Sequence, residues 1–71
     1  MQIINNNTVV VTTSDELKTV LEEDNNYTYI YFGNDITLTS GITINKNKEK
    51  VIIDGTYLNT RYTYTGMNSI E

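Results

Sequence analysis

The spacing of apolar residues divides the chain into an N-terminal part with one helix and a longer part built from strands. A run of β-branched residues at positions 8–12 predicts a strand. Thr13 and Glu16 fit a capping box, in which the Thr13 hydroxyl accepts from the Glu16 amide and the Glu16 carboxylate returns to the Thr13 amide. Three apolar residues then share one face at helical spacing: Leu17, Val20 and Leu21. We therefore expect a single helix that ends in the polar residues 24–26.

From Tyr27 onward the apolar period changes to two, which is typical of strands. Residues 27–32 alternate, and three further short strands are expected near positions 36–38, 42–44 and 51–53. The side chains predicted to point inward are Ile30, Phe32, Ile36, Leu38, Ile42, Ile44, Val51 and Ile53.

This strand pattern recurs once along the chain. A spacing of 22 positions relates Ile30 to Ile52, Ile36 to Leu58 and Ile42 to Tyr64. Coils of a parallel β-helix produce such a recurrence, because each inward residue stacks on its equivalent in the next coil. The match at Ile52 is one position out of phase with the inward Ile53, which leaves the register open.

Composition removes several classes of chemistry. The 71 residues contain no Cys and no His, so disulfides, thiolate metal sites and the commonest general base are absent. The net charge of −4 argues against binding to a nucleic-acid backbone, which depends on Lys and Arg. No apolar run approaches the ~18 residues of a membrane span, and the N-terminus lacks the pattern of a signal peptide. Leu, Ile, Val and Phe together make up nineteen residues, which favours a folded chain over a disordered one.

Five tyrosines are the candidate ligand contacts. Tyr27, Tyr29 and Tyr31 are expected to share one outward face, and Tyr62 and Tyr64 are expected to share another. Tyrosine rings that gather on a surface can stack on sugars or contact a protein partner. The alternative, which we favour, is that Tyr29 and Tyr31 pack beneath the helix or the N-terminal strand.

Two charged residues near these tyrosines have structural interpretations. Asp54, before Gly55, is expected to hydrogen-bond at a turn, since no second carboxylate for paired acid–base catalysis is evident. Arg61, the only arginine, is expected to be an exposed strand residue. No catalytic, cofactor-binding or metal-binding residue is therefore assigned.

The order of these elements resembles the N-terminal end of a right-handed β-helix of the pectin-lyase-like superfamily, and more narrowly the pectate-lyase-like adhesive domains of Gram-positive surface proteins. The resemblance covers residues 8–58 and rests on segments 9–11, 14–21, 29–32, 34–39, 42–44 and 51–55. It implies a mainly β fold with one N-terminal capping α-helix, the start of a parallel solenoid. Residues 1–71 would form a single domain or fragment, with a strand and capping helix at 8–24 and one to two β-helix coils at 27–65. A small α+β domain with an antiparallel sheet is the alternative fold.

The resemblance implies a non-catalytic structural or adhesive module, the N-terminal cap and first coils of a bacterial surface β-helix protein, with carbohydrate as a ligand class. Its location would be extracellular or at the cell surface, with the signal sequence outside this chain. Pectate lyases use calcium-binding acidic residues and a basic residue on later coils. No position here matches those residues, so calcium is expected only in a longer parent. Two alternatives stay open, the N-terminal fragment of a pectate-type polysaccharide lyase and a small protein-interaction domain.

The expected partners follow from the same interpretation. They are a polysaccharide or another cell-surface ligand, with no nucleic acid and no membrane span. An uncapped last coil would expose an apolar layer, so copies of the chain could also associate end to end.

Overall fold

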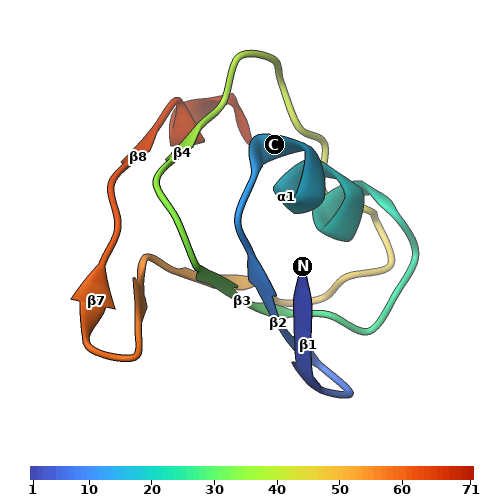
Figure 1. Ribbon diagram of the computed structural model, residues 1–71. Helices are drawn as coiled ribbons and strands as arrows, with labels where there is room; N and C mark the ends of the chain where they lie inside the picture. Colours follow the sequence, from blue (N-terminus) through green and yellow to red (C-terminus); the bar gives the residue numbers. More distant parts are fainter.

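The computed structural model, which describes residues 1–71, is a small α+β fold with mixed sheets (Figure 1). Its main sheet contains, in spatial order, β1 (Gln2–Asn5), β2 (Thr8–Val11), β3 (Tyr29–Phe32) and β5 (Ile52–Asp54). β1 runs antiparallel to β2, whereas β2, β3 and β5 run parallel to one another. The strands expected near 8–12, 27–32 and 51–53 are present, and β1 is an additional one.

The single helix, α1 (Ser14–Glu22), begins where the capping pattern predicts. The Thr13 hydroxyl accepts from the Glu16 amide at 3.1 Å, which confirms half of the capping box. The returning contact differs, because Glu16 Oε1 accepts from the amide of Thr12 at 2.8 Å and not from that of Thr13. β1 brings the Met1 amine to 2.8 Å from Glu16 Oε2, and the carboxylate lies between these two partners.

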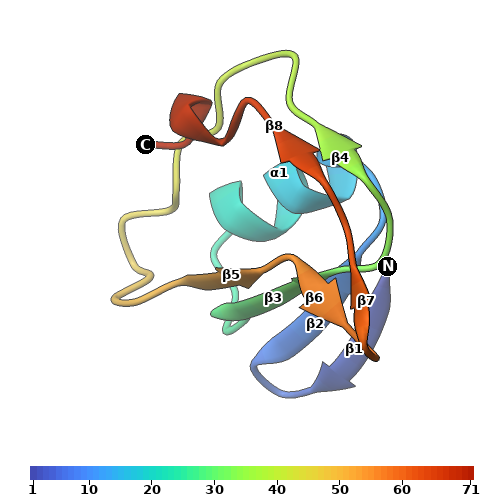
Figure 2. The same ribbon diagram turned by 90° about the vertical axis from the view of Figure 1, so that its left-hand side faces the viewer.

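Two further parallel pairings lie on other sides of the fold. β4 (Ile36–Thr37) pairs with β8 (Tyr64–Thr65), and Ile42 bridges Ile70 next to the 3₁₀ turn η1 (Met67–Ser69). The strand expected at 42–44 is thus reduced to a single bridge. We name residues 29–44 the first turn and residues 52–71 the second turn, which lies against the first on three sides (Figure 2). In the view of Figure 1, α1 lies inside the outline of these turns.

The register between the two turns differs from the expected spacing of 22 positions. The structure pairs Ile30 with Ile53, Ile36 with Tyr64 and Ile42 with Ile70, at spacings of 23, 28 and 28 positions. The step from 23 to 28 arises because an antiparallel hairpin, β6 (Thr56–Tyr57) and β7 (Thr60–Arg61), is inserted in the second turn. Leu58 lies at the hairpin tip and is 78% exposed, so its predicted stacking on Ile36 is wrong.

The core lies between α1 and the inner side of the first turn. Its buried side chains are Val9, Val11, Leu17, Val20, Leu21, Ile30, Phe32, Ile36, Leu38 and Ile42. Ile44, Val51 and Ile53 are partly buried against this cluster, so the predicted inward set is confirmed. No residue after Ile42 is buried to the same degree, which leaves the second turn covered on one side only.

Candidate functional site

Three tyrosines from two strands gather on the outer face of the main sheet. Tyr29 and Tyr31 lie on β3 with ring centroids 4.8 Å apart, and Tyr57 of β6 lies 5.1 Å from Tyr31. We name these three residues the tyrosine cluster. The successive rings are tilted by 43° and 47°, so they form a stepped surface on which a sugar could stack on one ring at a time. Tyr31 therefore packs against both Tyr29 and Tyr57. The two β3 tyrosines do not lie beneath α1, because the alternate residues Ile30 and Phe32 are the ones buried with the helix, and β2 separates β3 from β1 in the sheet.

Asp54 fixes one edge of the tyrosine cluster. Its Oδ2 accepts from the Tyr29 hydroxyl at 3.1 Å, and its Oδ1 accepts from the Thr56 amide at 2.9 Å. The hydrogen bond to this carboxylate favours the neutral phenol and raises the pKa of Tyr29 to about 12. The second contact confirms the expected turn role of Asp54, and both of its oxygens have partners.

Tyr27 does not share the outward face of Tyr29 and Tyr31, contrary to the expectation. Its side chain is partly buried against the core. The amides of Thr28 and Tyr29 both donate to the same acceptor, the Asn7 carbonyl, at 3.0 Å. Because consecutive amides point the same way there, the strand alternation begins only at Tyr29 and does not extend back to Tyr27.

Lys48 holds the segment around Tyr27 in place, which the sequence did not indicate. Its Nζ donates to the Tyr27 carbonyl at 2.9 Å and to the Asn25 carbonyl at 3.1 Å, and also to the Asn25 side-chain oxygen. Burial lowers the pKa of the Lys48 ammonium, and the charge of Asp24 opposes this shift. Lys48 thereby links the 45–50 segment to residues 25–27.

Tyr62 and Tyr64 do share a face, but it points toward the core and the uncovered side of the second turn. Tyr62 is partly buried against the core. The Tyr64 ring meets the Phe32 ring edge-on at 5.6 Å and remains 54% exposed. Together with Ile53, Met67 and Ile70, Tyr64 lines a mainly apolar hollow of about 310 Å³. We name these four residues the open end.

A second surface hollow adjoins the open end. It has a volume of about 320 Å³ and is lined by Arg61, Tyr62, Thr63 and Tyr64. Arg61 is exposed, as expected, and no acidic group of the chain forms an ion pair with it. The open end therefore has an apolar floor and one free positive charge at its margin.

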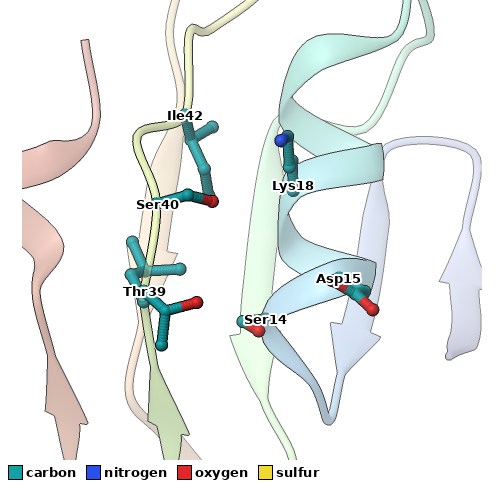
Figure 3. Close-up of a pocket in the computed structure, with 7 residues that line it drawn as sticks. Ser14, Asp15, Lys18, Thr39, Ser40 and Ile42 are labelled. Carbon is teal, nitrogen blue, oxygen red and sulfur yellow. The ribbon is translucent and has the colours of Figure 1, made fainter.

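A third hollow lies between the N-terminal half of α1 and the segment around Ser40 (Figure 3). Ser14, Asp15 and Lys18 line it from the helix, and Thr39 and Ser40 line it from the facing segment. Its volume of about 30 Å³ suits one or two water molecules and is too small for a sugar.

Neither a metal site nor a membrane-spanning helix is found among these elements. No three acidic side chains lie close enough together to hold a metal ion. The one α-helix is too short and too polar to cross a bilayer. In comparisons with known proteins, no family model, curated sequence or solved structure matches this chain.

Proposed function

We propose that the chain is a non-catalytic structural and adhesive module, the capped N-terminal end and first two turns of a parallel β-helix in a bacterial surface protein. The observation that carries this proposal is the parallel pairing of the second turn with the first on all three sides. Hairpin and meander folds pair successive strands antiparallel, whereas stacked coils pair the equivalent strands of neighbouring coils parallel.

The attachment of α1 supports its role as a cap. Leu17, Val20 and Leu21 are all at most 1% exposed, so the helix covers the apolar layer of the first turn. The C-terminal carbonyls of α1 are bound by Asn45, whose amide donates to the Leu21 carbonyl at 2.8 Å and whose side chain donates to the Glu22 carbonyl at 3.1 Å. A solenoid end needs such a cover, because an exposed apolar layer leads to aggregation.

Carbohydrate is the ligand class proposed for the tyrosine cluster. Its rings offer apolar faces, and each Asp54 oxygen accepts only one hydrogen bond within the chain, so its second lone pair can accept from a sugar hydroxyl at the margin of the cluster. The proposed location is the cell exterior, where polysaccharides are the available ligands. The open end provides a separate surface, through which copies of the chain can associate end to end.

Binding to polysaccharides tests the adhesive role. We expect the migration of the protein to be retarded in gels that contain one or more of a panel of acidic and neutral polysaccharides. Tyr57→Ala should raise the dissociation constant derived from this retardation at least about five-fold, since one aromatic contact is worth about 1 kcal/mol. Leu58→Ala, one residue along the same hairpin, is the matched control. Equal retardation by both variants, or none by the wild type on any polysaccharide, would remove the carbohydrate assignment.

Incubation with acidic polysaccharide and calcium tests the absence of catalysis. We expect no unsaturated product from the polysaccharide at any protein concentration. Formation of that product in proportion to protein would favour the lyase alternative instead.

A further inference from the structure

The open end combines an apolar floor with strand edges that have no partner. β5 pairs only with β3, β8 only with β4, and Ile70 only with Ile42. In a parallel pair, alternate residues direct their backbone N–H and C=O groups to the opposite edge. The Ile36 and Leu38 amides donate to the Thr63 and Thr65 carbonyls, so the backbone groups of the intervening Tyr64 face away from the first turn.

The main-sheet side shows the same pattern as the β8 side. The Ile52 amide donates to the Thr28 carbonyl at 2.8 Å, so the next residue, Ile53, directs its backbone groups outward. Ile53 and Tyr64 therefore each combine an apolar side chain in the floor with an unpaired strand edge, whereas Ile70 adds an apolar side chain but its amide already donates to the Met67 carbonyl at 3.2 Å. A surface of this kind favours an occupant that supplies both extended backbone and apolar side chains.

The dimensions of the open end suit a protein partner. The molecule measures 30 × 28 × 17 Å, and four strands at a spacing of about 4.8 Å account for most of the shortest dimension. The strands therefore stack along the shortest dimension of the molecule, and the face at the open end extends over the two longer dimensions. A face of that size is on the order of the 800 Å² that each partner buries in a standard protein interface.

We propose that two copies of this chain cover each other's open ends around a two-fold axis perpendicular to the stacking direction. The inference rests on the stacked turns of the proposed function and applies to the 71-residue chain. An axis through β5 places this strand antiparallel to its own copy. It also exchanges the other two sides, so that β8 faces Ile70 of the partner subunit. The apolar floor and the free edges then meet their equivalents, as a closed two-fold interface requires.

The charges at the margin of the open end fit this exchange. Arg61 lies on the β8 side, and Glu71 follows Ile70 on the third side; both are exposed and form no ion pair within the chain. Exchanging the sides brings each Arg61 toward Glu71 of the partner subunit, twice per dimer. These pairings offset part of the repulsion between two chains that each carry a charge of −4.

Sedimentation velocity and light scattering across a concentration series test the arrangement. We expect a concentration-dependent dimer of twice the 8.1 kDa chain mass. Tyr64→Lys should raise the dissociation constant at least about 30-fold, because it places two charges in the apolar floor. Leu58→Lys adds the same charge at an exposed position away from the floor and should leave the constant unchanged. Circular dichroism should show that each variant is folded.

A charge exchange tests the relative orientation of the two copies. Arg61→Glu and Glu71→Arg should each weaken the dimer about five-fold, and the double variant should restore wild-type affinity. Absence of rescue would overturn the exchanged orientation.

Two other outcomes would overturn the dimer itself. One is a strictly monomeric wild type at high concentration, which would leave the open end to a further turn of a longer polypeptide. The other is a dimer that tolerates Tyr64→Lys but is lost on Ile3→Lys, which would place the contact at the exposed strand β1. Either result leaves the stacked turns intact, whereas nuclear Overhauser effects that contradict the stacking would remove the proposed function as well.

Discussion

Substituting Leu17 by alanine tests whether α1 covers the core. Leu17 is 0% exposed in a chain in which only 11 of 71 residues are buried, so each buried side chain is a large share of the whole. Leucine-to-alanine changes at fully buried positions cost about 3 kcal/mol. A chain of this length has a free energy of unfolding of about 4–11 kcal/mol. Leu17→Ala should therefore remove a quarter or more of the total stability.

Urea unfolding followed by far-ultraviolet circular dichroism measures this loss. With a slope of about 1 kcal/mol per molar urea, a cost of about 3 kcal/mol lowers the midpoint by about 3 M or leaves the variant partly unfolded in buffer. Leu58→Ala removes the same atoms from a side chain that is 78% exposed and should cost less than about 0.5 kcal/mol. If Leu17→Ala cost less than about 1 kcal/mol, α1 would not be the cover of the core, and the capping role would fail.

Three further predictions concern the backbone and the titrating groups. Gly66 has a φ of 83°, and an added Cβ would lie 2.8 Å from the Leu38 carbonyl oxygen, so Gly66→Ala should cost about 2 kcal/mol in urea unfolding. Gly41→Ala, whose Cβ would meet its nearest atom at 3.6 Å, should cost under about 1 kcal/mol; equal costs would contradict the turn geometry. Asp54 raises the pKa of Tyr29 to about 12, so this pKa should fall toward its ordinary value of 10.0 in Asp54→Asn. Titration followed by ¹³C nuclear magnetic resonance measures the change, and an unchanged pKa would exclude the hydrogen bond. Since the folded-state pKa is the higher one, this contribution to stability is complete below pH 10 and is lost as the pH rises toward 12. The Met1 amine and the Thr12 amide lower the pKa of Glu16 below 4.5, so its contribution is present above that pH and is lost as the pH falls through the folded-state pKa. Glu16→Gln should flatten this acid dependence in urea unfolding, and an unaltered pH profile would refute the role.

The elements that depend on local side-chain pattern were predictable from the sequence. α1 follows from the Thr13 cap and its apolar stripe, and the inward set of the first turn follows from the period of two. β1 could not be predicted in this way, because all of its residues are exposed and it is held by backbone pairing with β2. The capping contact of Glu16 differed for a related reason, since its partners include the distant Met1 amine.

The β6–β7 hairpin explains most of what the sequence missed. Its tip residues Leu58 and Asn59 adopt positive φ angles of 50° and 65°, and no glycine marks the turn. Asn tolerates this conformation, but Leu rarely adopts it, so the usual turn signal is absent. The hairpin shifts the register of β8 by five positions relative to β5 and brings Tyr57 onto Tyr31. The tyrosine cluster therefore depends on an insertion that the apolar pattern does not encode.

The central claim is that the second turn stacks in parallel on the first, and nuclear Overhauser effects in solution test it most directly. The stacked arrangement predicts side-chain contacts of Ile30 with Ile53, Ile36 with Tyr64 and Ile42 with Ile70. An antiparallel small-domain fold would instead give close Hα–Hα contacts between residues 36–38 and 42–44, with none of the three stacked pairs. Observation of all three pairs is the predicted result, and the antiparallel set would contradict the stacked turns and the function proposed from them.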